Sequence, residues 1–517
     1  MNSQTKNKED YFDTNRVNTD LKGRAMRSAG ATIFASGLIF FVQLFSTVIL
    51  ARLLTPNDFG LITMVTTFSM LLQNFGLNGF TEAIIQRDDI NHQTISTLFW
   101  VNISISFLLT LLFVFLSPVL AWFYSTPELS SITTGIAFSI IATGVGTIHS
   151  ALMRRNMQFY LISAIEMASA FISFFIAIIM AWLGFGYWAL VANFVIRPVI
   201  FTVCSWIFCG WRPGAPGPLK EIFPILKFAI HTYGNFTLQY FSRNIDKLLI
   251  GWRHDAQSVG HYKKAYDLFA LPASQLIVPI HNVALATLSR LTNEPDNYRR
   301  YYLSAISIIA FVAMPLSAMM TLAGKDIILF ILGPQWTKAG IIFCYFGLSI
   351  GIMLIYATQG WLHLSLGRPD RWLRWCIFEC IATTAFFIVG LRWGAEGVAI
   401  GYAASFYVLL GPCLRYAGRP IKLKLNSIIS AVWKYFASSA LAGVLSYFIL
   451  YKIPYLHAFF YKQHVFLKIL IASILCGVLY LLLIVLFYQS VSPIKNFFFT
   501  ARQMLPAKNY KSTQRHE

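Results

Sequence analysis

Charged residues are scarce in this sequence. Only 12% of its 517 residues are charged, whereas 57% are hydrophobic and 16% are aromatic. A soluble domain carries about 25% charged residues, so this chain could not cover the surface of several water-soluble domains. The composition excludes a soluble enzyme and predicts an all-α protein that crosses a membrane many times.

Acidic residues are scarcer than basic ones. The chain has 21 Asp and Glu against 41 Lys and Arg, which gives a formal net charge of +20. In a membrane protein such an excess is typical of cytoplasmic loops. Nucleic-acid binding is the weaker interpretation, because the basic residues never form one long patch, and no nucleic-acid partner is expected.

The motifs of common catalytic sites are also missing. The seven cysteines lie in or at the ends of apolar stretches, and no His cluster completes a zinc site. There is no Gly-rich phosphate loop and no nucleophile motif. We therefore expect no catalytic residue, no metal and no cofactor, and a transporter rather than an enzyme.

Long apolar stretches predict fourteen membrane helices, since a spanning helix needs about 20 mostly apolar residues. Two of the stretches, near 225–250 and 261–287, are more polar than the rest, and the second contains Pro272 and Pro279. The predicted organisation is a cytoplasmic tail at 1–28, a six-helix lobe at 29–209, a cytoplasmic linker at 210–224, a second six-helix lobe at 225–414, two further helices at 429–488 and a basic cytoplasmic tail at 489–517.

The positive-inside rule tests this count. If the N-terminus is cytoplasmic and the loops alternate, most basic residues outside the helices fall on the cytoplasmic side. A miscounted helix in the middle would invert everything after it. We therefore predict a multi-pass protein of the inner (plasma) membrane with both termini in the cytoplasm.

An internal repeat links the two halves. The segment from Ala51 to Gly60 recurs from Gly251 to Gly260, at an offset of 200 residues. At an offset of 213, Arg155, Phe159 and Glu166 match Arg368, Trp372 and Glu379. Further along, Leu183-Gly184-Phe185-Gly186 resembles Trp393-Gly394-Ala395-Glu396-Gly397. The common order predicts that two halves of six helices share one orientation.

Two motifs carry a resemblance to a known family. They are Val48-Ile49-Leu50-Ala51-Arg52-Leu53-Leu54-Thr55-Pro56-Asn57-Asp58-Phe59-Gly60 and Asn244-Ile245-Asp246-Lys247-Leu248-Leu249-Ile250-Gly251, followed by Gly260-His261-Tyr262 and Tyr266-Asp267-Leu268. In these elements the chain resembles the polysaccharide-exporter branch of the multidrug/oligosaccharidyl-lipid/polysaccharide (MOP) superfamily. It is similar to Wzx-type flippases of the colanic-acid type.

The resemblance implies a fold and a function. Family members have fourteen helices in two lobes around a central cavity, and they move undecaprenyl-pyrophosphate-linked oligosaccharides across the membrane by alternating access. The product would serve lipopolysaccharide, capsule or exopolysaccharide assembly. The expected partners are the lipid-linked substrate, membrane lipids, and a polymerase and a chain-length regulator of the assembly complex.

The seventh predicted helix carries a polar stripe. Its members recur at spacings of three and four, which places them on one helical face: His231, Asn235, Gln239, Ser242 and Asp246, with Arg243 and Lys247 beside them. A charge at the bilayer centre costs about 2.5–3.5 kcal/mol on insertion scales, so embedded charges usually face a cavity or a partner. The stripe either lines a substrate cavity or forms an internal Arg243–Asp246–Lys247 ion network.

Other candidate cavity residues lie on three more helices. Neutral amides suit carbohydrate hydroxyls, although they equally suit bonds between helices. Arg197 precedes Pro198 in a helix that the proline would kink. The candidates are Arg52, Asn74, Asn78 and Arg197.

Four acids could pair with these cations or couple transport to ions. They are Glu166, Asp246, Asp267 and Glu379, with structural pairing the favoured role. The alternatives to a polysaccharide flippase are a drug exporter of the same superfamily, a lipid II-type flippase and a non-transporting scaffold. The drug exporters typically use a carboxylate in the first helix, and the stretch 29–50 contains none.

Overall fold

The computed structural model of this protein describes residues 21–86, 90–495 and 497, and this part of the chain is helical without a strand. It forms two compact units that divide between Lys263 and Lys264, inside one helix. The helices of the first unit are α3 (Leu21–Leu53), α4 (Pro56–Gln86), α5 (His92–Phe115), α6 (Ser117–Phe123), α7 (Glu128–Arg155), α8 (Phe159–Trp182), α9 (Tyr187–Phe208), η1 (Leu219–Glu221), α10 (Phe223–Arg253) and the start of α11 (Ala256–Arg290).

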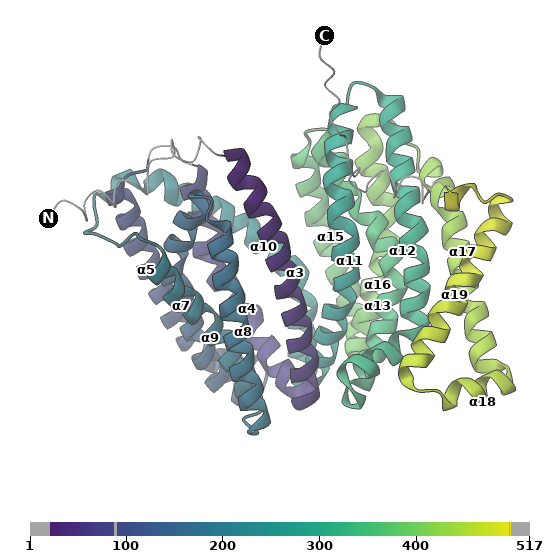
Figure 1. Cartoon of the computed structure of the whole chain (residues 1–517), viewed down its shortest axis with the longest axis horizontal. Coiled ribbons are helices and arrows are strands. Elements are labelled where there is room, and N and C mark those ends of the chain that lie inside the picture. The colour runs from purple at the N-terminus through teal and green to yellow at the C-terminus, as the bar shows by residue number, and fades with distance from the viewer. Residues whose placement is uncertain (1–20, 87–89, 496, 498–517) are drawn as a thin grey trace, which may run out of the picture. The chain divides into compact units, whose positions relative to one another are not determined.

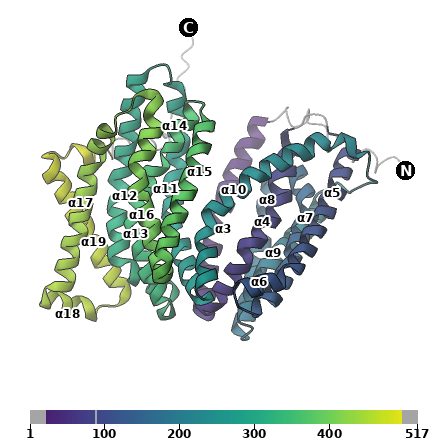
Figure 2. The same cartoon turned by 180° about the vertical axis from the view of Figure 1, so that it is seen from behind.

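The second unit contains the rest of α11. Its other elements are α12 (Pro295–Leu332), η2 (Pro334–Trp336), α13 (Thr337–Ala357), α14 (Gln359–Ser365), α15 (Pro369–Gly390), η3 (Leu391–Trp393), α16 (Gly394–Gly418), η4 (Arg419–Ile421), α17 (Leu425–Lys452), α18 (Pro454–Lys462) and α19 (Val465–Tyr488). α12 packs against α13, α17 and α19, and α16 packs against α13 and α15. Figure 2 shows α18 joining α17 and α19 at one end.

In the first unit, α7 is the central helix. It packs against α4, α5 and α9, while α3 packs against α8 and α10 packs against α4 (Figure 1). The contacts therefore place α10 with the first unit, whereas the sequence predicted the lobe boundary in the linker at 210–224. The division into two six-helix lobes stays a prediction from the repeat.

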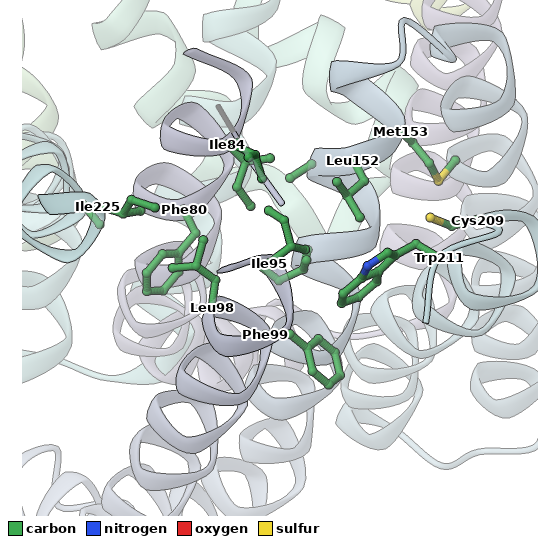
Figure 3. Close-up of a cluster of buried hydrophobic side chains, with 14 of the residues drawn as sticks. Phe80, Ile84, Ile95, Leu98, Phe99, Leu152, Met153, Cys209, Trp211 and Ile225 are labelled. Carbon is green, nitrogen blue, oxygen red and sulfur yellow. The ribbon is translucent and has the colours of Figure 1, made fainter. Parts of the chain in front are cut away.

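A core of buried side chains closes one end of this unit. Ile84 of α4, Leu98 of α5 and Met153 of α7 converge there with Cys209 and Trp211, as Figure 3 shows. Trp211 is only 1% exposed, so the predicted linker is anchored by a large apolar side chain. The backbone N–H of Gly214 donates to Ser96 Oγ at 2.9 Å, and that of Gly217 donates to Thr97 Oγ1 at 2.7 Å.

Helical structure extends beyond the predicted apolar stretches. Helix α3 begins at Leu21, because basic residues continue the helix past its apolar part; residues 1–20 lie outside the described part, and the cytoplasmic tail at 1–28 stays a prediction. The polar stretches near 225–250 and 261–287 are the continuous helices α10 and α11. Nine spans in the described residues are long and apolar enough to cross a membrane, and the count of fourteen crossings stays a prediction.

Lipid contact explains the apolar surface of these helices. Several large aromatic side chains are exposed at the helix ends that the sequence predicts to be external: Trp122, Trp182, Trp393 and Tyr455. Tryptophan and tyrosine are enriched at both membrane–water interfaces, where an apolar ring meets polar headgroups. The exposed apolar faces and rings are those of a multi-pass membrane protein.

The structure corrects the register of the repeat. α3 ends at Leu53 and α10 at Arg253, while α4 begins at Pro56 and α11 at Ala256, which keeps the offset of 200. Later in the chain the offset is 210, not 213. Met157 and Gly367 hold equivalent positions in two corresponding turns, and each has a positive φ (56° and 64°). The N–H groups of the next residues, Gln158 and Arg368, bond to Met153 O and His363 O.

This turn is a Schellman motif, which ends a helix by satisfying its last carbonyl groups. The offset persists at the next connection, where Gly184 and Gly394 both have positive φ values. With an offset of 210, Arg155 corresponds to Ser365 and Glu166 to Cys376. The match of Glu166 with Glu379 is therefore wrong as a repeat relationship.

Candidate substrate-binding site

Asp246 and Lys247 form a buried ion pair near the end of α10. Their side chains are 4% exposed, and Lys247 Nζ lies 3.3 Å from Asp246 Oδ1. Lys247 Nζ also donates to Arg243 O at 3.1 Å and to Asn244 Oδ1 at 3.2 Å. Tyr262 Oη of α11 donates to the other carboxylate oxygen, Asp246 Oδ2, at 2.8 Å.

This geometry favours the structural alternative for Asp246 and Lys247. A buried charge pair is tolerable only when further hydrogen bonds satisfy its remaining donors and acceptors, and here both groups have such bonds. A substrate that took Lys247 would have to break them. Arg243, which the sequence grouped with this pair, is exposed instead.

Two tyrosines earlier in α10 fix this helix to α4. Tyr233 Oη donates to Leu71 O at 2.9 Å, and Tyr240 Oη donates to Thr67 O at 2.8 Å. By the 100° step of an α-helix, positions 231, 235 and 242 lie on the face opposite to these tyrosines, whereas position 239 lies about 100° from Tyr240. The side chains of His231, Asn235, Gln239 and Ser242 themselves lie outside the described residues.

The candidates on α3 and α4 have local roles in the structure. Arg52 is exposed in the last turn of α3, where a cation interacts favourably with the helix C-terminus. Asn74 Nδ2 donates to Met70 O of its own helix at 2.6 Å. The side chain of Asn78 lies outside the described residues. Gln73, which sequence reasoning missed, donates from α4 to Ser139 Oγ of α7 at 2.5 Å.

Arg197 differs from the other embedded charges. It is half-buried in α9 and makes neither a hydrogen bond nor an ion pair with any residue that the structure describes. Asn193 lies one turn earlier on the same helix, half-buried and equally without a bonding partner in the described chain. Sequence reasoning missed Asn193, although its spacing of four from Arg197 was the available signal.

The four candidate acids divide between the two units. Asp246 is paired as described, and Glu166 lies 3.9 Å from Arg154, with both side chains about two-fifths exposed (39% and 44%). Asp267 in α11 and Glu379 in α15 are half-buried and have interaction partners. No group of three or more His, Cys, Asp or Glu side chains that could hold a metal occurs among the described residues.

Arg155 has a structural role that its sequence context did not reveal. It is 9% exposed, and its guanidinium donates to Ile84 O in the last turns of α4 at 2.8 Å. The last carbonyl groups of a helix lack partners inside the helix, and a basic side chain can satisfy them. Arg155 therefore joins the ends of α4 and α7 rather than facing a substrate.

Comparison with known proteins identifies the family. Residues 49–340, more than half of the chain, match the family described as polysaccharide biosynthesis proteins. The chain belongs to this family. The predicted relationship to polysaccharide biosynthesis proteins is thereby confirmed.

Relatives with curated names span most of this polysaccharide biosynthesis protein. The lipopolysaccharide biosynthesis protein WzxC of Escherichia coli is 22% identical over 78% of this chain and 85% of its own length. The teichuronic acid biosynthesis protein TuaB of Bacillus subtilis is 24% identical, with 82% and 88% covered. The succinoglycan biosynthesis transport protein ExoT of Rhizobium meliloti is 21% identical, with 70% and 74% covered.

Solved structures show the fold. The lipid II flippase MurJ in an inward closed conformation matches with a TM-score of 0.70 at 16% identity, over 89% of this chain and 98% of MurJ. An inward-facing MATE multidrug transporter of the MOP superfamily matches with a TM-score of 0.54 at 14% identity, over 74% and 94% of the two chains. The polysaccharide biosynthesis protein therefore shares the helical fold of these two structures.

Proposed function

We propose that this protein is a flippase that moves undecaprenyl-pyrophosphate-linked oligosaccharide repeat units across the inner membrane by alternating access. The product serves the assembly of lipopolysaccharide, capsule or exopolysaccharide. Family membership supports this function, because WzxC, TuaB and ExoT are named for three different polysaccharides. A lipid-linked intermediate is the chemistry that such pathways share.

The number and pairing of the carboxylates in α3 and α10 favour this proposal over a drug exporter. α3, the first described helix, contains no carboxylate, and Asp246 is the single carboxylate of α10. Because Lys247 and Tyr262 already bind Asp246, neither helix offers an unpaired carboxylate to a cationic drug. The half-buried Arg197 instead favours an anionic substrate.

The orientation and partners belong to the same proposal. Both termini are cytoplasmic, and a polymerase and a chain-length regulator receive the exported repeat unit on the far side of the membrane. A lipid II-type substrate carries the same polyprenyl pyrophosphate, so the charges of the helices suit it equally. The names of the relatives favour the polysaccharide substrate.

Deletion of the gene in its source organism tests the function. We expect loss of one surface polysaccharide and accumulation of its lipid-linked repeat unit on the cytoplasmic face, with plasmid-borne wild-type protein restoring both. Accumulation of lipid II instead would assign the other substrate. Unchanged polysaccharide together with increased drug sensitivity would refute the proposal in favour of an exporter.

A further inference from the structure

Arg197 lies at the middle of its membrane helix. It is the eleventh of the 22 residues of α9, counted from Tyr187 to Phe208. With a rise of 1.5 Å per residue, its Cα is about 15 Å from either end of the helix, which is half the thickness of a hydrocarbon layer of about 30 Å. An arginine at this depth cannot reach the headgroup region with its own side chain, whereas residues near helix ends can.

None of the described residues forms an ion pair with Arg197. Arg155 is the other described arginine of the first unit that is shielded from solvent, and it donates a hydrogen bond to Ile84 O. Arg197 has no such bond within the described chain, and Asn193 presents a second unpartnered polar group one turn away. An embedded cation that stays without a protein partner is expected where an external anion binds.

Neighbouring helices α7 and α4 carry polar groups at a similar depth, on the side of α9 that faces away from the site: by the 100° step of an α-helix, Asn193 and Arg197 lie about 200° and about 240° around α9 from Val191. On α7, Gly135 packs against the side chain of Val191, and Gly146 packs against that of Thr202. Because both contacts advance along the two helices together, α7 and α9 run side by side in the same direction. Ser139 lies between these two contacts on α7, as Arg197 lies between them on α9. Gln73 of α4 reaches Ser139, and α4 also packs against α9.

We propose that Arg197 and Asn193 form a phosphate-group site at the midplane of α9, which the pyrophosphate of the lipid-linked substrate occupies during its passage. The inference rests on the proposed function and names the part of the substrate that is bound. A guanidinium can bind two phosphate oxygens at once, and the Asn193 amide adds one neutral donor. The phosphates of resident phospholipids lie about 15 Å away at the interface, so a phosphate at this depth is one in transit.

Native mass spectrometry of the purified full-length protein tests the site. The probes are undecaprenyl pyrophosphate and, as a headgroup phosphate, phosphatidylglycerol. We expect Arg197→Gln to weaken undecaprenyl pyrophosphate binding at least tenfold and to leave phosphatidylglycerol binding unchanged. Arg197→Lys should retain part of the binding, because an ammonium acts as a point charge. Arg253→Gln, at the exposed end of α10, is the matched control and should bind both lipids as the wild type does.

Folding is measured on the same samples. Because Arg197 has no partner among the described residues, Arg197→Gln should melt at the wild-type temperature or above it; a lower melting temperature would identify a structural role and overturn the site. If Arg197→Gln does not accumulate, Asn193→Leu must weaken undecaprenyl pyrophosphate binding, and unchanged binding would overturn the site. Equal binding of the pyrophosphate by wild type and Arg197→Gln, or equal losses for both lipids, would also overturn it. A wild-type protein that binds no undecaprenyl pyrophosphate would refute the proposed function itself.

Discussion

Gly60 and Gly260 each pack against the first turn of the other's helix. A Cβ atom on Gly60 would lie 1.6 Å from Ala256 O, and one on Gly260 would lie 1.9 Å from Pro56 O. Both glycines are helical without a positive φ, so backbone conformation does not require them. The close approach of the first turns of α4 and α11 requires glycine at both positions. This contact explains why glycine recurs at the offset of 200.

Alanine at either glycine should therefore disturb the structure. We expect Gly60→Ala and Gly260→Ala each to destabilise the protein by about 1–3 kcal/mol, the usual range for overpacking, because the atom in the way is backbone and cannot rotate aside. Thermal unfolding in detergent, followed by tryptophan fluorescence, measures the effect. Gly37→Ala is the matched control, since a Cβ there meets nothing within 4 Å. A Gly60→Ala protein as stable as Gly37→Ala would contradict the contact.

The buried ion pair makes a second prediction. Asp246→Asn should destabilise the protein by about 3–5 kcal/mol and lower its abundance in the membrane, because Lys247 would remain buried without its counter-charge. Adding Lys247→Met to Asp246→Asn should restore most of the abundance, since the uncompensated charge is gone. Membrane immunoblots of the two variants compare them directly. If the double variant were scarcer than Asp246→Asn alone, the pair would not be a structural unit.

Stability should change in opposite directions when glycine is introduced into one of the two equivalent turns and removed from the other. Met157 has φ 56° and Gly367 has φ 64°. The left-handed region costs a residue with a Cβ about 1 kcal/mol relative to glycine. We expect Met157→Gly to raise the melting temperature slightly and Gly367→Ala to lower it, although a Cβ at 367 meets no atom within 4 Å. A stabilising Gly367→Ala would show that the turns, and with them the offset of 210, are not equivalent.

The topology is testable with reporter fusions. Fusions at residue 92 and at the C-terminus should be cytoplasmic, and a fusion at 458, within α18, should be external. This pattern follows from the positive-inside rule applied to fourteen crossings. An external C-terminus would mean an odd number of crossings.

The sequence predicts the helical class well, because each membrane helix needs its own apolar stretch. It also predicts the repeat around Gly60 and Gly260, where the two segments keep the same length. The later register failed because three charged and aromatic residues matched by chance at 213, whereas the turn at Met157 and Gly367 leaves no shared residue type to detect. Interaction partners are harder still to predict, because nothing in the local sequence indicates that Tyr262 reaches Asp246. Nor does it indicate that Asn193 and Arg197 lack a hydrogen bond to any described residue.

A reconstituted flipping assay tests the central claim most directly. Purified protein would be placed in liposomes that contain a fluorescent undecaprenyl-pyrophosphate-linked oligosaccharide, and a membrane-impermeant quencher would report the rate at which inner-leaflet label reaches the outer leaflet. We expect the wild-type protein to speed this exchange well above that of protein-free liposomes, and Arg197→Gln to return it nearly to that level with the fold intact. Exchange by the wild-type protein no faster than in protein-free liposomes would contradict the account.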